Sequence, residues 1–346
     1  MHNSPSTRLR LVTANSAGWP GWTEASDDFL QDLSIRQYSP YTINWYRSIL
    51  SPFVRFLGDD GSKCLPSRVD EVLARGFIAD ISLHGASGRG PLGAKRQNDY
   101  RDGLHLFWRW LLEHDYATAN PWEHVAKARE GRKIIATLTS TQIKALLDQP
   151  PIHLFVGLRD FCFMMLLLDT GLRLSETLSL QLPDLDLGQA TVKALGKGNK
   201  ERVVGISSRM LNELEAYRQN RAKALEGIGM GGSPWLFPND IGGKLTPKAF
   251  QVRMRAYGDK AGISGVRVSP HTLRHTHAVN FIRSGGDAFY LQRILGHSSL
   301  EMTRRYCEVA DEDAISRQRE LSPLHTMDLP LSRQRRMKMI PEWKCS

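Results

Sequence analysis

Apolar residues recur at helical spacing in four stretches of the first third of the chain. These stretches are residues 27–33, 41–57, 69–81 and 98–115. Ser39-Pro40 stands just before the second stretch and is a helix-start signal, with serine as the cap and proline in the first turn. The pattern predicts a small all-helical domain over residues 22–126, after a flexible N-terminus at residues 1–21.

The basic, polar segment 127–136 has no apolar periodicity and is predicted to be a linker, either a solvated tether or a contact to a phosphate backbone. Beyond it, residues 189–195 and 201–206 are rich in β-formers and flank Gly-Lys-Gly-Asn, which predicts a β-hairpin. Helical patterns occupy residues 139–149, 159–171, 207–226, 247–262, 270–284, 287–295 and 299–306, with a polar stretch to about 320. The fold class predicted for the chain is mainly α with a small β-sheet, the sheet lying in an α+β domain at 137–320 that precedes a basic C-terminal tail at 321–346.

The charge balance favours a polyanionic partner. The chain has 46 Lys and Arg against 36 Asp and Glu, a formal net charge of +10, which is compatible with nucleic acid but does not prove it. The four cysteines form no Cys-x-x-Cys pair, so they indicate reduced thiols rather than a zinc ribbon or a disulfide framework. We see no signal peptide and no apolar run long enough to span a membrane, and we expect a cytoplasmic protein.

Four short segments carry side chains suited to chemistry on a phosphate. They are TGLRLSE with Arg173 and Glu176, GKGNKER with Lys197, HTLRHTH with His271 and Arg274, and LGHSSLEMTRRY with His297 and Tyr306. Each segment alone is weak evidence. All four in this order and at these separations resemble the motif set of the tyrosine recombinase (phage integrase) family, in the branch of Xer and of phage or transposon integrases. The resemblance is strong over residues 137–310 and weaker over 22–126.

The resemblance implies cleavage of a phosphodiester without metal, ATP or any other cofactor. Arg173 and Arg274 would clamp the non-bridging oxygens, because a guanidinium stays charged and binds bidentately. Tyr306 would attack and become linked to the 3′ phosphate. His271, one helical turn before Arg274, would assist proton transfer from the tyrosine, and His297 would donate a hydrogen bond to the phosphate.

Two further residues complete the implied set. Lys197 on the hairpin would be the general acid for the 5′ oxygen, and Glu176 would support the arginines. Lys200 and Arg202 compete with Lys197, or are solvated charges of the hairpin. Arg173 and Glu176, taken alone, would also suit a buried ion pair.

Other candidates have simpler interpretations. His271, His275 and His277 suggest a metal cluster, but a threonine stands where a zincin needs glutamate and no third ligand is indicated, so His275 is expected to make a structural hydrogen bond in the helix. Tyr290 and Tyr257 are rivals of Tyr306 that suit packing. The aromatic residues Phe107, Trp108 and Trp110 are expected to form helix core rather than a base-stacking platform.

The resemblance also implies an architecture. A helical core-binding (SAM-like) domain at 22–126 and a tyrosine recombinase catalytic domain at 137–320 would form a C-shaped clamp on double-stranded DNA. Four protomers on two DNA sites would act as a homotetramer, or as a heterotetramer with a related recombinase, with the helix near 311–320 docking onto a neighbour. The favoured function is site-specific recombination, for integration, excision or transposition of a mobile element or for resolving chromosomes. The alternatives are a type IB-like topoisomerase and a DNA-binding module that has lost catalysis.

Overall fold

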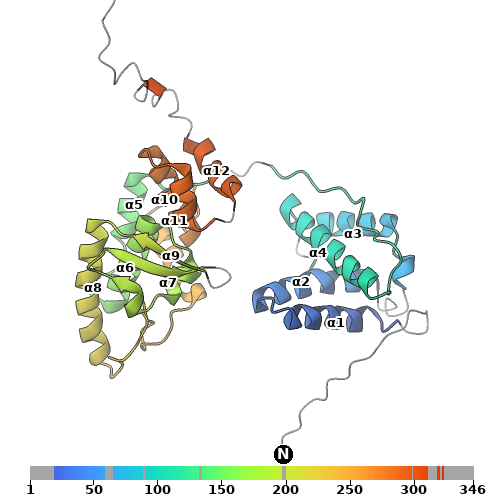
Figure 1. Cartoon of the computed structure of the whole chain (residues 1–346), viewed down its shortest axis with the longest axis horizontal. Coiled ribbons are helices and arrows are strands. Elements are labelled where there is room, and N and C mark those ends of the chain that lie inside the picture. Colours follow the sequence, from blue (N-terminus) through green and yellow to red (C-terminus); the bar gives the residue numbers. More distant parts are fainter. Residues whose placement is uncertain are drawn as a thin grey trace, which may run out of the picture. The chain divides into compact units, whose positions relative to one another are not determined.

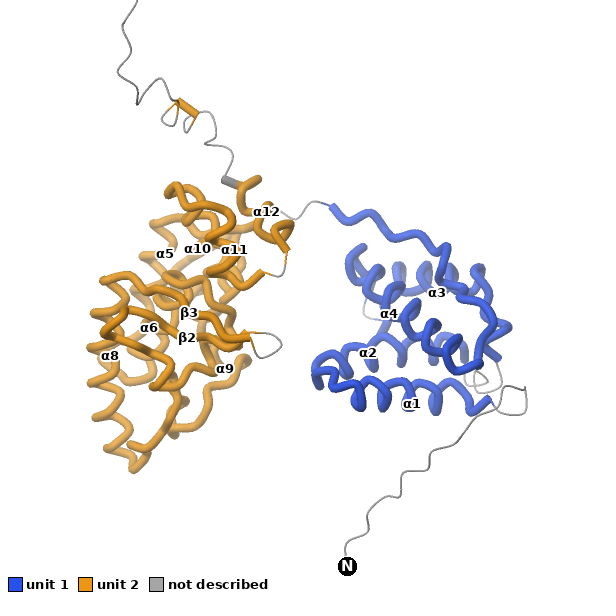
Figure 2. Tube along the Cα trace, viewed as in Figure 1, with its two compact units in different colours: residues 1–133 blue, residues 134–346 orange. Residues whose placement is uncertain are grey.

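The computed structural model describes residues 19–58, 65–88, 90–131, 135–196, 200–297, 299–310, 318–319 and 322. The chain divides into two compact units, Met1–Lys133 and Ile134–Ser346 (Figure 2). The predicted linker at 127–136 spans this division. Each unit has a hydrophobic core of its own.

The described part of the first unit contains helices and no strands (Figure 1). Its elements are α1 (Trp22–Ile35), α2 (Pro40–Phe56), η2 (Pro66–Arg68), α3 (Glu71–His84) and α4 (Ala94–Glu113). Ser39 caps α2 by accepting a hydrogen bond from the backbone N–H of Thr42, as the Ser-Pro signal predicts. Asp70 caps α3 in the same way. Local sequence thus sets where these two helices begin.

Large aromatic side chains fill the core of the first unit. Edge-to-face contacts connect the rings of Trp22, Phe53, Phe77, Trp108 and Trp122. The run 107–110 lies in this core, because Phe107 and Trp108 are fully buried and Trp110 nearly so. The prediction that these rings are packing residues is therefore confirmed.

The second unit combines helices with one small sheet (Figure 1). Its elements are α5 (Ser140–Leu147), α6 (Phe155–Thr170), α7 (Leu174–Ser179), η3 (Leu182–Asp184), β1 (Leu185–Asp186), β2 (Thr191–Leu195), β3 (Glu201–Gly205), α8 (Ser208–Glu226), α9 (Pro247–Lys260), α10 (Pro270–Arg283), α11 (Ala288–Leu295) and α12 (Leu300–Ala310). The strands are antiparallel in the order β1-β2-β3. The predicted hairpin is β2–β3, and β1 is a short strand that the sequence pattern did not indicate. The fold is thus mainly α with a small sheet, as predicted.

Two central helices organise the second unit. Helix α6, the predicted buried helix, packs against both α8 and α10, and α10 also contacts α11 and α12. A small apolar cluster built from α10 and α11 encloses the ring of Tyr306 on α12. Residues 311–317 and 320 of the predicted polar helix lie outside the described residues. Within the described part of the chain, no helix is long and apolar enough to cross a membrane.

Gly171 ends α6 in the left-handed region, with φ of 63°. A Cβ at this position would lie 2.5 Å from His277 Cδ2 and 2.7 Å from Leu295 Cδ2. Only glycine therefore lets α6, α10 and α11 approach one another here, at the turn that leads into α7.

We expect Gly171→Ala to destabilise the second unit through both backbone strain and this steric overlap. The strain contributes about 1 kcal/mol and the overpacking a further 1–3 kcal/mol or so. The measurement is the free energy of unfolding by urea. Gly262→Ala is the matched control, because Gly262 also has a positive φ, of 65°, but open space around its Cβ position. Equal losses in the two variants would contradict the close approach at Gly171.

Candidate active site

The second unit brings together four of the predicted catalytic side chains. Arg173 stands at the N-cap of α7, Arg274 lies in α10, His297 follows the C-cap of α11, and Tyr306 lies in α12. Nη2 of Arg173 donates to the carbonyl of Gly296, 3.1 Å away, and Nη2 of Arg274 lies 3.1 Å from Nε2 of His297. The rings of His297 and Tyr306 are stacked with centroids 6.1 Å apart.

The carboxylate of Glu176 connects two arginines. Arg173 donates to it through Nη1 at 2.9 Å and through its backbone N–H at 2.8 Å. Arg202 of β3 donates through Nη1 and Nη2, at 2.8 and 2.7 Å. Burial alone would raise the pKa of Glu176, but the hydrogen bonds from Arg202 and Arg173 outweigh it and lower the pKa to about 2. The predicted ion pair of Arg173 with Glu176 is therefore present and fixes the orientation of Arg173.

The sequence alone suggests that Arg202 is either a rival of Lys197 for the role of general acid or a solvated charge of the hairpin. Its side chain is instead mostly buried, and Nε donates to the carbonyl of Ile294 at 2.9 Å. With its bidentate bond to Glu176, it joins β3 to α7 and to the end of α11. The sequence held no signal for this role, because the partners are distant in the chain.

Arg274 is held by carbonyls at two helix ends. Nη1 donates to the carbonyl of Gly171 at 2.5 Å, and Nη2 donates to that of Leu295 at 2.9 Å. Its side chain is 5% exposed. Burial, and then the charge of Arg173, lower the pKa of Arg274 to about 10. The guanidinium is thus still charged at neutral pH, next to a second cation, which is an arrangement that favours an incoming anion.

His297 is neutral in this environment. Burial, followed by the charges of Arg274, Arg173 and Arg202, lowers its pKa to about 4. Its Nδ1 lies 3.0 Å from Oγ1 of Thr303. The ring therefore has a hydrogen-bond partner on each nitrogen.

Tyr306 is buried, with 4% of its surface exposed, and its hydroxyl lies 2.9 Å from Nδ1 of His275. Burial raises the pKa of Tyr306, while Arg274, Arg173 and Arg305 oppose this effect. His275 was expected to make a structural hydrogen bond in its helix; its partner is instead the phenol of α12. Its position directly after Arg274 gave no sign of that contact.

His271 lies one turn before Arg274 and is exposed. Burial of part of the ring, followed by the charges of Arg274 and Arg173, lowers its pKa. Lys197 lies outside the described residues. On either side of it, the backbone N–H of Gly196 donates to the carbonyl of Lys200 at 2.8 Å. Lys200 is exposed.

The two other candidate tyrosines lie in different surroundings from Tyr306. Tyr290 is 64% exposed, and Tyr257 donates to Asp160 in a separate buried network.

No group of three or more His, Cys, Asp or Glu side chains suited to a metal occurs among the residues that the structure describes.

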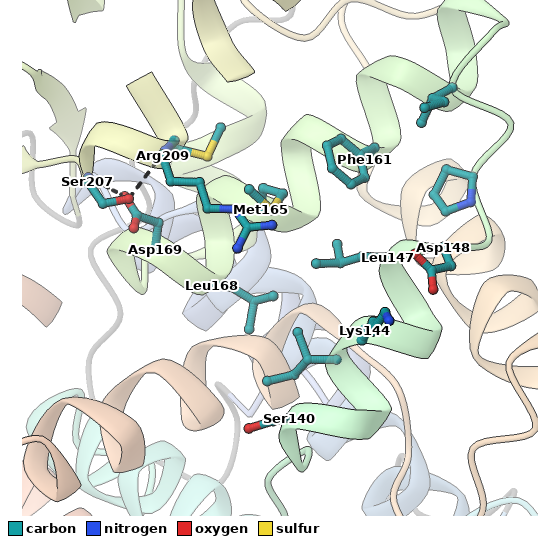
Figure 3. Close-up of a pocket in the computed structure, with 14 residues that line it drawn as sticks. Ser140, Lys144, Leu147, Asp148, Phe161, Met165, Leu168, Asp169, Ser207 and Arg209 are labelled. Atoms are coloured by element: carbon teal, nitrogen blue, oxygen red, sulfur yellow. Dashed lines mark hydrogen bonds between the residues drawn. The ribbon is translucent and has the colours of Figure 1, made fainter. Parts of the chain in front are cut away.

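A cavity of about 800 Å³ opens between α5, α6 and the start of α8 (Figure 3). Leu147, Phe161, Met165 and Leu168 give it an apolar lining, with Lys144 and Arg209 also present. Its described lining contains no residue of the four motifs.

Comparisons with known proteins agree with the geometry. The sequence profile of the phage integrase family matches residues 136–313. The tyrosine recombinase XerC of Myxococcus xanthus is 32% identical over 275 residues, which is 79% of this chain and 89% of the relative.

Two solved structures share the fold. The XerH site-specific recombinase bound to palindromic difH substrate in a post-cleavage complex has a TM-score of 0.66 at 19% identity, covering 90% of this chain and 85% of that one. The Tn1549 transposon integrase in complex with a circular intermediate DNA has a TM-score of 0.66 at 18% identity, covering 86% of this chain and 99% of that one.

The ionised state of Glu176 predicts a specific pH dependence of stability. Because its pKa is lowered to about 2 from an ordinary 4.5, its stabilising effect is complete above pH 4.5 and is lost as the pH falls towards 2. Relative to Glu176→Gln, the parent should lose about 2 kcal/mol of unfolding free energy between pH 6 and pH 3.

Urea unfolding of the parent and of Glu176→Gln at a series of pH values measures this difference in unfolding free energy. Glu201→Gln on β3, where the side chain is 60% exposed, is the control for loss of a carboxylate near the same hairpin. A difference between parent and Glu176→Gln that stays constant from pH 6 to pH 3 would show that Glu176 is not held ionised by the two arginines.

Proposed function

The chain belongs to the phage integrase family of tyrosine recombinases, and from that premise we propose that it breaks and rejoins DNA strands in site-specific recombination through a 3′-phosphotyrosine link at Tyr306. The observation that carries the proposal is the convergence of Arg173, Arg274 and His297 beside the Tyr306 ring. Two guanidinium groups and an imidazole around one phenol suit a phosphodiester, since its charge is spread over two non-bridging oxygens.

In the proposed reaction the two arginines bind the non-bridging oxygens of the scissile phosphate. Arg274 is rigid, because carbonyls of Gly171 and Leu295 hold it, and Arg173 is oriented by Glu176. Donors fixed before the substrate arrives need no reorganisation as negative charge develops, and removal of one such donor typically costs on the order of 10²–10³ in rate.

The phenol oxygen of Tyr306 then attacks phosphorus, and the bond from phosphorus to the 5′ oxygen breaks. In the resting site the phenol oxygen lies within hydrogen-bond distance of Nδ1 of His275, and burial, followed by His271 and Arg274, lowers the pKa of His275 and so favours its neutral form. His271 assists removal of the proton, and Lys197 supplies a proton to the 5′ oxygen. Attack of a 5′ hydroxyl on the phosphotyrosine reverses these steps and reseals a strand.

The remaining assignments follow from the same proposal. The first unit, with residues 22–126, is the core-binding domain and contacts double-stranded DNA. Four protomers act on two sites, alone or with a related recombinase. The protein acts on DNA in the cytoplasm. The role we favour is mobilisation of a genetic element by integration, excision or transposition.

A suicide-substrate experiment tests the proposal. DNA that the protein retains from a random pool is sequenced, resynthesised as nicked duplexes and incubated with protein in chelator and without ATP. We expect a covalent adduct with the parent and none with Tyr306→Phe, because the phenol oxygen forms the link. Tyr290→Phe, at an exposed position of α11, is the matched control and should react like the parent. Tight binding without any adduct would leave only a DNA-binding module.

A further inference from the structure

One buried hydroxyl beside the site has no part in the reaction described above. Thr303 is fully buried in α12, with its Oγ1 at 3.0 Å from Nδ1 of His297. It precedes Tyr306 by three residues, which places the two side chains on neighbouring turns of one helix face. The same helix therefore supplies the phenol and a hydrogen-bond partner of His297.

The contacts of His297 define where its proton lies. Nε2 faces Nη2 of Arg274 at 3.1 Å, and a guanidinium has donors but no acceptor. Nε2 must therefore accept this bond. A neutral imidazole then has its proton on Nδ1, so Nδ1 donates to Oγ1 of Thr303.

In this tautomer Nε2 of His297 carries no proton, so it cannot donate a hydrogen bond to a phosphate oxygen. Full protonation is one route to a donor, but in the free protein the pKa of about 4 makes it unfavourable by about a thousandfold at pH 7. The other route keeps the ring neutral. The proton leaves Nδ1, one from solvent is taken up at Nε2, and Nδ1 becomes an acceptor that needs a donor opposite it.

We propose that Thr303 is the positioning residue that allows His297 to change tautomer when the scissile phosphate arrives. A threonine hydroxyl accepts from Nδ1–H in the resting site and, after rotating about its C–O bond, donates to Nδ1 in the complex. In the complex a phosphate oxygen accepts from the Nη2–H of Arg274 that had faced Nε2 and also from Nε2–H of His297, while the carbonyls of Gly171 and Leu295 still hold the guanidinium. The inference rests on the proposed function, because it assigns His297 the contact to phosphate.

The hydroxyl also connects His297 with the nucleophile. Thr303 and Tyr306 move together if α12 shifts, so the donor form of His297 is available only when α12 is in place. A hydrophobic residue of the same shape would pack equally well but would leave Nδ1 without a partner in either state.

Thr303→Val and Thr303→Ser test the role. The first is isosteric and lacks the hydroxyl, and the second retains it. In single-turnover reactions on nicked DNA we expect Thr303→Val to form the covalent adduct on the order of 10–100-fold more slowly than the parent, and Thr303→Ser within about threefold of it. Thr276→Val, which removes another fully buried hydroxyl that bonds to Leu138 and Thr272, is the control for a general loss of stability.

A double-mutant cycle separates positioning from structure. If Thr303 acts through His297, Thr303→Val should slow the reaction no further in a His297→Ala background. Equal slowing with and without His297, or no slowing in Thr303→Val, would overturn the proposal. A parent that forms no adduct would instead overturn the proposed function, and this role with it.

The tautomer has its own spectroscopic signature. Nitrogen-15 NMR of the labelled histidines, with His297 assigned by comparison with His297→Ala, should show a protonated Nδ1 and an unprotonated Nε2 in the free protein at pH 7. On binding uncleaved DNA, Tyr306→Phe should show the reverse pattern, and Tyr306→Phe/Thr303→Val should not. The same pattern before and after binding in Tyr306→Phe would contradict the switch, whatever the rates.

Discussion

The buried guanidinium of Arg274 is the constraint on which the geometry of the site depends. It binds the carbonyl of Gly171 at the end of α6 and that of Leu295 at the end of α11, and it also faces His297. A buried cation whose donors lose their acceptors is strongly destabilising. The ends of both helices must therefore stay where they are, and Gly171 is required because a side chain there would collide with His277 and Leu295. The same contacts therefore fix both the approach of these helix ends and the position of the Arg274 guanidinium.

The buried carboxylate of Glu176 complements the buried guanidinium of Arg274. Glu176 is the carboxylate around which Arg173 and Arg202 gather, and it stays ionised because their donors saturate its oxygens. It neutralises one charge where two arginines meet, but the pKa values of His297 and His271 are still lowered, first by burial and then by the charges of Arg274 and Arg173. The resting site thus holds more positive than negative charge at short range. An anion such as a phosphate diester would relieve this imbalance.

Local patterns predicted the elements well, and long-range contacts account for what they missed. Ser39-Pro40, the Gly-Lys-Gly-Asn turn and the apolar run in α6 are signals that neighbouring residues alone can read. The motifs likewise placed Arg173, Arg274, His297 and Tyr306 in one site. Arg202, His275 and Thr303 were misread or passed over, because each acquires its role from a partner on another element: Glu176, Tyr306 and His297. Spacing along the chain carries no information about such pairs until the helices are packed.

The identity of the nucleophile is the central claim, and peptide mapping of the covalent protein–DNA complex tests it most directly. The complex formed on nicked DNA is digested with nuclease and protease, and the modified residue is located by mass spectrometry. We predict a nucleotide remnant joined through its 3′ phosphate to the phenol oxygen of Tyr306, whose ring lies beside His297 and whose hydroxyl is hydrogen-bonded to His275. A remnant on Tyr290, on a cysteine or joined through a 5′ phosphate would contradict it.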